Sequence, residues 1–502
     1  MISADHLNEP AGLPPTANGR SISNLMHMIW RSRPDLQAKF DLEDERGRER
    51  FIAWYAWAAP REFRMPALIP ANGHVPAAPS NLLYSMKSVA ERASRFGRWL
   101  PLRARRRLMR SWTRVGIALS AKGIGGKASS EQRKPEPGVN LVGYANGALS
   151  LGEHLRMTAS AFATTGCGMD IVDYRNGARD RQSAQGDRIA LADGNRFAAN
   201  LFHINADQML NAYCHFGHSF FQQRYNIGFW AWELESFPNG WVPVIDLLHE
   251  IWAPSRFVQQ AVAHVTEKPV MLMPQCVELP EFEPRQRAHF GLPDDEYLYI
   301  FVFDFLSYID RKNPVAAIQA FKAAFPDQAG RAGLVLKVMN GDERDVRWAA
   351  MLAEIDGDSR IIIINEVMSR AESLALMACC DCFVSLHRSE GFGRGPAEAM
   401  LLGKPVIVTG YSGNLEFTLP DNSFLVDYTL VPVQPDQYVF GDGQVWAEPD
   451  IDHAAQHMRT VYADRATADA VARRGQSYVR EHLSARRTGE LMAERLAVLG
   501  LI

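Results

Sequence analysis

Short apolar runs alternate with helix-like stretches in the chain from residue 138 to about residue 275. A helix is predicted at residues 153–165. The apolar runs predict strands at residues 139–144, 169–174, 198–204, 226–232, 250–253 and 271–273. This alternation is typical of a parallel sheet in an α/β domain.

A second cycle of the same kind begins at residues 297–303. Further strands are predicted at residues 334–338, 361–364, 382–386 and 405–409, with helices between them at residues 314–325, 348–354, 370–378 and 396–402. The chain therefore predicts two doubly wound, Rossmann-like α/β domains with a joint near residues 275–290. The cleft between such domains is a natural ligand site.

The first 135 residues have a different pattern. Residues 34–57 read as largely helical, and residues 66–79 are rich in Pro and Ala, as a linker would be. Residues 86–114 carry ten Lys and Arg against one Glu, a net charge of +9, interleaved with aromatic and aliphatic residues. Such a segment favours an anionic membrane surface. The alternative is a solvated basic face, and nucleic acid is a weaker third interpretation.

Composition narrows the class of protein. A chain of 502 residues exceeds one hydrophobic core, and its 47% hydrophobic and 22% charged residues are ordinary globular values. The net charge of -3 gives no general case for nucleic acid. We expect no spanning helix and no secretory signal. Six cysteines in a chain of this length do not form a disulfide framework, which indicates the reducing cytosol. The Cys379, Cys380 and Cys382 group is predicted to be buried thiols rather than a zinc site.

Residues 387–400 carry the most specific chemistry. Glu390 is followed by a glycine-rich turn, and Glu398 falls about one turn into the predicted helix after it. A strand–loop–helix of this kind directs backbone N–H groups at an anion, where the helix dipole favours negative charge. A carboxylate inside the helix accepts hydrogen bonds from sugar hydroxyls, as in dinucleotide sites. The pattern indicates recognition of a nucleotide that carries a sugar.

Residues 385–415, together with residues 303–314, resemble the retaining glycosyltransferases of group 1, or family four, which have the GT-B fold. The resemblance covers residues 138–490. It implies an α/β protein with two Rossmann-like domains facing a cleft. The expected parts are a helical extension at 1–135, an acceptor domain at 136–280, a donor domain at 281–480, and a C-terminal helix at 481–502 that packs back on the acceptor domain.

The resemblance also implies roles for residues of the donor domain. Arg311 and Lys312 match the basic pair that holds the donor diphosphate, where fixed cations stabilise the charge of the leaving group. Glu390 matches the carboxylate near the donor sugar, and Glu398 the one that contacts the ribose. The loop beside the sugar and phosphates comprises Gly391, Phe392 and Gly393.

Other positions are implied less directly. Asn365 and Val367 follow a strand and are expected near the base. Lys337 ends a strand that faces the same cleft, and the alternative is a surface lysine. Gly147 and Gly152 match the first glycine-containing loop, where a missing side chain permits close approach of ligand to backbone.

The chain departs from the family in its middle strand, which lacks the histidine that many members place near the sugar. Glu233 is expected in that role, or Trp232 as a face for sugar stacking. His203, one strand earlier, is the other candidate, with a structural histidine as its alternative. His154 is either an acceptor contact or a residue of the helix start.

The resemblance implies an enzyme that moves a sugar from a nucleoside-diphosphate sugar to a glycan or lipid-linked acceptor, in cell-surface polysaccharide or glycolipid synthesis. It implies no metal and no other cofactor, so the acids at Asp356, Asp358, Asp450 and Asp452 are interpreted as loop residues. We expect a cytoplasmic protein, peripheral on the inner face of the plasma membrane through residues 86–114. The alternatives are a GT-B sugar-nucleotide epimerase and a non-catalytic sugar-nucleotide-binding scaffold.

Overall fold

The computed structural model describes residues 7, 9–16, 19–57, 134–147, 150–174, 190–326 and 331–502. The linker at residues 66–79 and the basic segment at residues 86–114 lie outside these ranges. The chain divides into two compact units, Met1–Pro135 with Asp207–Gln223, and Glu136–Ala206 with Arg224–Ile502. Within the described ranges, no helix combines the length and apolar character that crossing a membrane requires.

The smaller unit is helical in its described part. It contains α2 (Asn24–Arg31), α3 (Pro34–Lys39), α4 (Glu45–Trp57), most of α9 (Ala206–Phe216) and α10 (His218–Phe221). Residues 34–57 were predicted as one largely helical stretch, but the chain leaves the helix at Phe40, which is extended. A new helix starts after Asp44, whose carboxylate accepts a hydrogen bond from the Gly47 N–H at 2.9 Å.

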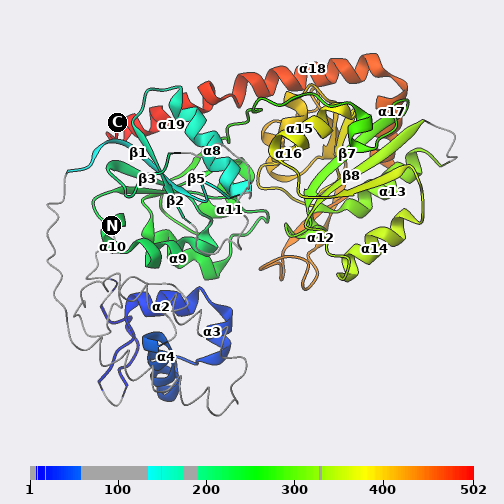
Figure 1. Ribbon diagram of the computed structural model, residues 1–502. Helices are drawn as coiled ribbons and strands as arrows, with labels where there is room; N and C mark the ends of the chain where they lie inside the picture. The colour runs from blue at the N-terminus through cyan, green and yellow to red at the C-terminus, as the bar shows by residue number, and fades with distance from the viewer. Residues whose placement is uncertain are drawn as a thin grey trace, which may run out of the picture. The chain divides into compact units, whose positions relative to one another are not determined.

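The larger unit contains, in its described residues, two six-stranded parallel sheets (Figure 1). The first sheet has the order β2-β1-β3-β4-β5-β6. Its strands are β1 (Glu136–Gly143), β2 (Met169–Asp173), β3 (Phe197–His203), β4 (Tyr225–Phe229), β5 (Glu250–Ala253) and β6 (Val270–Leu272). The helical segments of this half are α8 (Ser150–Ala163), η2 (Asn239–Leu247) and α11 (Arg256–Ala263).

The second sheet has the order β12-β11-β10-β7-β8-β9. Its strands are β7 (Tyr297–Asp304), β8 (Ala332–Met339), β9 (Ile361–Asn365), β10 (Cys382–Ser385), β11 (Val406–Thr409) and β12 (Phe424–Val426). Its helical segments are η3 (Arg287–Phe290), α12 (Ile309–Lys312), α13 (Pro314–Ala324), α14 (Val346–Ile355), α15 (Arg370–Cys379), α16 (Arg394–Leu401), η4 (Ser412–Glu416) and α17 (Ile451–Ala463). An antiparallel pair, β13 (Tyr428–Pro432) and β14 (Val445–Pro449), stands apart.

The predicted α/β class with two doubly wound domains is confirmed by these sheets. The domain limits at residues 135, 280 and 480 remain predictions. The strand predicted at residues 226–232 is too long, because β4 ends at Phe229 and the chain then bends into a loop. Trp230 and Trp232 still bury their rings in that loop, against Phe237. The run of apolar residues therefore extends beyond the end of the strand, which is why the predicted strand was too long.

A ladder of asparagines runs through the interior of the first sheet. Asn140, Asn200 and Asn226 occupy paired positions on β1, β3 and β4, and each is almost fully buried. Asn140 Nδ2 donates to Asn200 Oδ1 at 2.9 Å, and Asn200 Nδ2 donates to Asn226 Oδ1 at 2.9 Å. Because buried amides are costly without partners, the ladder favours this register of the three central strands.

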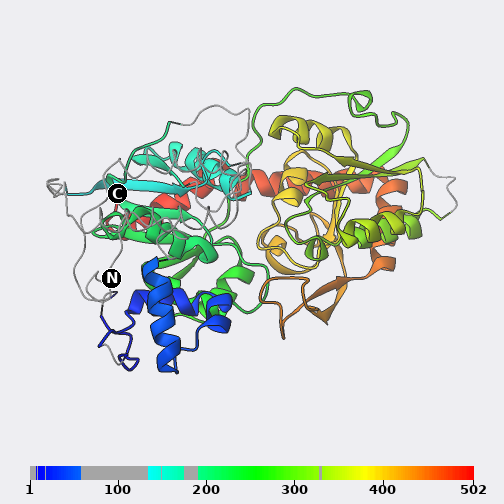
Figure 2. The same cartoon turned by 60° about the horizontal axis from the view of Figure 1, so that its bottom comes forward.

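Two C-terminal helices connect the two halves of the larger unit (Figures 1 and 2). The first, α18 (Arg465–His482), packs against α16 beside the second sheet, and the next, α19 (Ala485–Val498), packs against α8 beside the first. Arg495 of α19 forms an ion pair with the fully buried Glu250 at 2.5 Å. The last residues of the chain thus form part of the first sheet's surroundings.

The packing of α19 on α8 depends on Gly489. A Cβ added there would lie 2.3 Å from the Ala161 carbonyl oxygen and 2.9 Å from Thr164 Oγ1. We expect Gly489→Ala to lower the melting temperature, because the helices must separate at a cost of about 1–3 kcal/mol. Gly194→Ala is the matched control, since a Cβ there meets no atom within 4 Å. Equal melting temperatures for the two variants would contradict this packing.

Candidate functional site

Glu390 lies in the loop between β10 and α16, buried against two cations. Arg311 Nη1 lies 3.0 Å from Glu390 Oε2, and Lys312 Nζ donates to Glu390 Oε1. The Glu390 N–H donates to Ser412 Oγ at 2.8 Å, which fixes the backbone of the loop. The motif acid and the basic pair, 78 residues apart along the chain, therefore form one cluster.

Two largely buried cations contact the carboxylate of Glu390. Burial alone would raise the pKa of Glu390, but Arg311 and Lys312 lower it well below its usual value, so the carboxylate is ionised. Glu390 is in direct contact with both cations, and the charge of Glu233 acts on both of them from beside the cluster. Arg311 is 4% exposed, and its buried Nε has no hydrogen-bond partner in the described part of the chain. The arrangement has capacity for a further anion.

Backbone contacts hold Arg311 in place. Its Nη1 donates to the Ser389 carbonyl at 2.7 Å and its Nη2 to the Ser307 carbonyl at 3.2 Å. The short helix that carries it lies between Tyr308 and Asn313, both with left-handed φ values. Arg311 thus joins the loop after β7 to the loop after β10, so the cation and Glu390 are positioned together.

The glycine loop is tightly packed against the first half of the unit. The Gly391 carbonyl accepts a hydrogen bond from Ser255 Oγ at 2.7 Å, and a Cβ at Gly391 would lie 3.0 Å from the Trp232 carbonyl oxygen. Gly393 has φ of +94° and precedes the first turn of α16. Phe392 is buried, with its ring 5.1 Å from that of Phe417. Glycine is therefore needed for close approach at 391 and for conformation at 393.

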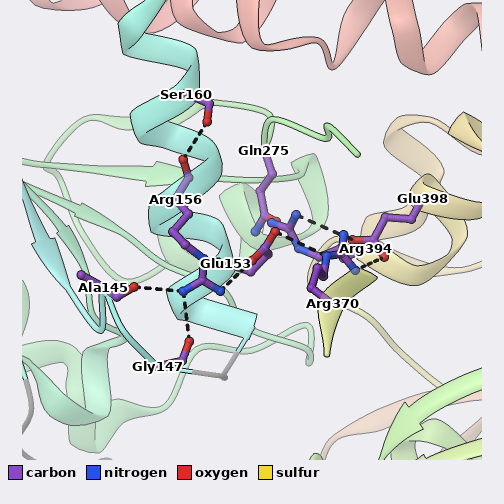
Figure 3. Close-up of polar contacts among 9 residues, drawn as sticks. All are labelled: Ala145, Gly147, Glu153, Arg156, Ser160, Gln275, Arg370, Arg394 and Glu398. Atoms are coloured by element: carbon purple, nitrogen blue, oxygen red, sulfur yellow. Dashed lines mark hydrogen bonds and ion pairs between the residues drawn. The ribbon is translucent and has the colours of Figure 1, made fainter. Parts of the chain in front are cut away.

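Glu398 is engaged by a cation that the sequence did not indicate. Arg370, the first residue of α15, donates to both of its carboxylate oxygens, at 2.5 and 2.9 Å (Figure 3). Glu398 is 3% exposed. Arg370 Nε also lies 3.5 Å from Oε1 of Glu153, which belongs to α8 in the other half of the unit. The acid expected to contact a ribose is therefore part of a larger charged group.

Glu233 lies beside the Glu390 cluster. It accepts a hydrogen bond from the Tyr438 hydroxyl at 2.6 Å, and its backbone carbonyl accepts one from Ser389 Oγ. Its charge contributes to the raised pKa of Arg311, which burial alone would lower. Trp232, in contrast, is 2% exposed and donates its Nε1–H to the Ser236 carbonyl. A buried ring of this kind offers no free face to a sugar.

His203 ends β3 and is fully buried beside His154 of α8. Their ring centroids lie 4.5 Å apart at an angle of 89°, and both rings contact Phe229. Neither ring nitrogen of His203 has a hydrogen-bond partner among the described residues. Burial lowers the pKa of His203 to about 3, so the ring is neutral at physiological pH.

The positions predicted near the base have different surroundings. Asn365 is exposed at the end of β9 and exchanges hydrogen bonds with the Gly341 backbone at 3.1 and 3.3 Å. Val367 is 79% exposed. Lys337 is 1% exposed and donates to the Glu366 carbonyl at 2.5 Å and to the Val338 carbonyl at 3.2 Å. The alternative interpretation of Lys337 as a surface lysine is therefore wrong.

The first glycine loop packs on the start of α8. A Cβ at Gly152 would lie 2.4 Å from the Gly147 carbonyl oxygen, so the loop needs glycine at this helix position. The Gly147 carbonyl accepts a hydrogen bond from Arg156 Nη1 at 3.1 Å, and the Ala145 carbonyl accepts one at 2.9 Å (Figure 3). The loop carbonyls thus face an arginine.

The acidic pairs discounted as metal ligands have local contacts. Asp358 pairs with Arg360 at 2.5 Å, Asp356 ends α14 in a left-handed conformation, and Asp450 caps the start of α17. No group of His, Cys, Asp or Glu with the geometry of a metal site occurs within the described ranges. All six cysteines lie in those ranges as free thiols, and Cys380 and Cys382 are buried.

Sequence reasoning missed His387, Asn414, Arg370 and Arg394. His387 is fully buried, and its Nε2 lies 3.0 Å from Asn414 Oδ1. Arg394 falls inside the glycine motif, so its position was visible in the sequence. Its partner Gln275, at 3.1 Å, comes from the other half of the unit (Figure 3). Charged residues at the first position of a helix would have been the available indication, because a cation there is unfavourable.

Comparison with known proteins is consistent with this geometry. Residues 282–477 match the family described as glycosyl transferases group 1. No curated protein sequence matches the chain significantly.

Several solved structures are similar to the chain. Sucrose-phosphate synthase from Thermosynechococcus elongatus is 16% identical, with a TM-score of 0.53, and the match covers 73% of this chain and 99% of that one. HepE from Anabaena, in complex with UDP-glucose, is 13% identical over 72% of this chain and 100% of its own, with a TM-score of 0.52. A glycosyltransferase from Rickettsia africae is 13% identical over 72% and 99%, with a TM-score of 0.51. These likenesses show the GT-B fold.

The buried histidines predict how stability depends on pH. Burial lowers the pKa of His203 to about 3 and that of His387 to about 4, from an unfolded value of 6.5. Below pH 6.5 the unfolded chain therefore binds more protons than the folded one, so stability falls as the pH falls. Each histidine accounts for about 2 kcal/mol of that loss at about pH 5.

When the pH is lowered from about 7.5 to about 5, we expect the melting temperature of His203→Met to fall less than that of the parent protein. Thermal unfolding at a series of pH values measures the difference. The exposed His264 provides the control, because His264→Met should follow the parent. Parallel pH profiles for all three proteins would show that His203 is not a buried neutral histidine.

Proposed function

Because residues 282–477 match the glycosyl transferases group 1 family, we propose that the chain is a glycosyltransferase. In this proposal it transfers a sugar, with retention of anomeric configuration, from a nucleoside-diphosphate sugar to a glycan or lipid-linked acceptor. The observation that carries this proposal is the buried cluster of Glu390 with Arg311 and Lys312, next to the glycine loop before α16. Its two cations are held side by side by Glu390, with Glu233 beside them, and two adjacent cations suit a diphosphate.

The donor diphosphate binds Arg311, Lys312 and the backbone N–H groups of residues 391–393 in this proposal. The cations are fixed in advance by Glu390 and by backbone carbonyls. As the glycosidic bond breaks, negative charge develops on the departing phosphate. Groups that are already oriented toward that charge stabilise the transition state without reorganising. Cationic side chains thus take the place of a divalent metal.

Glu390 and Glu398 recognise the two sugars of the donor. Glu390 lies beside the phosphate-binding cations, so it is placed for the hydroxyls of the transferred sugar. Glu398 accepts hydrogen bonds from the ribose, next to those it already accepts from Arg370. Each carboxylate oxygen has two lone pairs and can accept from both. Asn365, Val367 and Lys337 are assigned to the region of the base.

Acceptor activation is assigned to the departing phosphate, which takes the proton of the attacking hydroxyl. Glu233 is the second candidate, because it lies beside the cluster and its carboxylate is within hydrogen-bonding distance of Tyr438. His203 is neutral and fully buried beside α8. Like Trp232, it therefore presents no free face to a sugar, and the role near the sugar is assigned to Glu233. Gly147 and Gly152 belong to the same acceptor side.

Two other functions remain to be distinguished by experiment. An epimerase converts the sugar nucleotide into its epimer with no net release of nucleoside diphosphate, whereas a transferase releases nucleoside diphosphate in proportion to the acceptor that is added. A non-catalytic scaffold binds the sugar nucleotide without consuming it. The compact cluster of acid and cations favours a catalytic site over a scaffold, because a binding role alone does not require charge stabilisation at a leaving group.

Nucleoside diphosphate binding tests the proposal. The similar structure of HepE was determined in complex with UDP-glucose. UDP is therefore the first ligand to test, followed by GDP, ADP and TDP. We expect at least one to raise the melting temperature by mass action. Arg311→Gln should weaken binding by about 10-fold or more, since a charge-assisted hydrogen bond contributes about 1.5–3 kcal/mol.

Arg256→Gln is the matched control for this test. Arg256 also forms an ion pair, with Glu416 at 2.8 Å, but it is largely exposed and outside the cluster. The Arg256→Gln variant should keep the full rise in melting temperature on nucleotide binding. If none of the four nucleotides raises the melting temperature of the well-folded protein, the donor site is assigned wrongly.

We further propose that the enzyme works on the inner face of the plasma membrane, in polysaccharide or glycolipid synthesis, with residues 86–114 as the contact. Ten cations in that segment give an attraction of about 1 kcal/mol each near an anionic surface. The full chain should sediment with phosphatidylserine-containing vesicles and not with phosphatidylcholine vesicles. Changing the ten cations to Gln should abolish sedimentation, and equal pelleting of both proteins would eliminate the membrane role.

A further inference from the structure

A second charged cluster lies between the two halves of the larger unit, and the reaction proposed above does not require all of it. We call it the arginine cluster, and its five charged members are Glu153, Arg156, Arg370, Arg394 and Glu398 (Figure 3). The first two belong to α8, the third to α15 and the last two to α16. Three arginines are therefore gathered around two carboxylates.

Each carboxylate accepts hydrogen bonds from one of the arginines. Glu153 Oε2 accepts from Arg156 at 2.6 and 3.0 Å. Glu398 accepts from Arg370 through both oxygens. Arg394 is left over, because the nearest carboxylate oxygen, on Glu398, lies 3.9 Å from its Nη1. This distance is too long for a hydrogen bond.

Arg394 is nevertheless buried. Its side chain is 14% exposed, and its Nη2 donates to the neutral Gln275 Oε1 at 3.1 Å. Its Nη1 and the Nε of Arg370 are inaccessible to solvent and have no hydrogen-bond acceptor within the described ranges. Burial lowers the pKa of Arg394, although Glu398 and Glu153 act in the opposite direction. A largely buried guanidinium without a hydrogen-bonded carboxylate is a costly feature to retain.

The local backbone adds to the positive potential. Arg370 and Arg394 are the first residues of α15 and α16, and Glu153 lies in the first turn of α8. Three helix N-termini therefore meet at the cluster, each with a partial positive charge. Cations are unfavourable at such positions, whereas an anion is favoured by the dipoles and by the unpaired N–H groups together.

We propose that Arg394, with Arg370, binds an anionic group of the acceptor, either a phosphate or a carboxylate. This inference rests on the proposed function, which assigns the donor diphosphate to Arg311, Lys312 and the backbone N–H groups of residues 391–393. Of the arginine cluster, only Glu398 is assigned to the donor, as a contact of its ribose. The cluster also includes α8 and Gln275 of the first half, which is the acceptor side. The acceptor is accordingly a charged sugar or sugar–lipid, and its anion completes the charge balance of the cluster.

A planar guanidinium suits this role. It holds two oxygens of a phosphate or carboxylate at once, which fixes orientation as well as charge. Arg394 directly follows Gly393, the last residue of the phosphate-binding loop. An acceptor anchored there has its hydroxyl groups next to the donor. Arg394 is therefore a specificity-determining residue that rejects neutral acceptors, because they leave its charge unpaired.

The test uses the full protein saturated with UDP, or with the nucleotide that binds best. Glucose 6-phosphate, glucuronate and neutral glucose are added at equal ionic strength, and melting temperatures are measured. We expect a shift with one or both charged sugars and none with glucose. A response to glucose 6-phosphate alone identifies a phosphate group, and a response to glucuronate alone identifies a carboxylate.

Arg394→Gln should weaken the binding of the charged sugar by 10-fold or more. Its affinity for UDP should remain within about twofold of that of the parent protein. Without ligand this variant should melt no lower than the parent, since an unpaired buried charge is removed. Arg394→Lys keeps the charge but loses the planar fork, so it should retain part of the shift. Arg256→Gln, in an exposed ion pair, should behave as the parent.

Three results would overturn the inference. The first is an unchanged anion shift in Arg394→Gln. The second is competition between the charged sugar and UDP, with both weakened by Arg394→Gln, because the cluster would then serve the donor diphosphate. The third is UDP binding without any response to charged sugars. Anion binding without any nucleotide binding would instead refute the proposed donor site and leave the anion site in place.

Discussion

The burial of Glu390 against Arg311 and Lys312 is the interaction on which the site depends. A carboxylate inside the protein is tolerated only with ionic and hydrogen-bonded partners. Those partners lie in the loop after β7, whereas Glu390 lies in the loop after β10. The Arg388 N–H also donates to the Arg311 carbonyl at 2.8 Å. The two loops are therefore held as one surface, and the two cations are fixed before any ligand arrives.

The first sheet supplies the other support of this surface. Ser255 donates to the Gly391 carbonyl, and the Glu233 carbonyl accepts from Ser389. The glycine loop of one half is thus positioned by side chains and backbone of the other. The arginine cluster repeats the arrangement, since α8 contributes to a group of charges that α15 and α16 complete. Binding at either cluster involves both halves of the unit, which suits a reaction between two substrates.

Much of the fold follows from local pattern. Buried strands such as β5 and β7 read as apolar runs, and their ends were predicted to within a residue. Errors arose where apolar residues serve another purpose. Beyond Phe229, the tryptophans fill a loop rather than extend β4, and Phe40 closes α3 although the helical pattern continues. Periodicity shows that a side chain is buried but does not show what it is buried against.

The sequence by itself determined the two parallel sheets, the strand–loop–helix around Glu390 and the identity of the basic pair, because apolar runs and glycine spacing act over a few neighbouring residues. Only the tertiary structure decided which charges meet. Arg370 donates hydrogen bonds to Glu398, and Arg394 lies 3.9 Å from the same carboxylate, because segments far apart along the chain approach one another in the fold. Electrostatic pairing depends on distance in space, and no local pattern of residues encodes that distance.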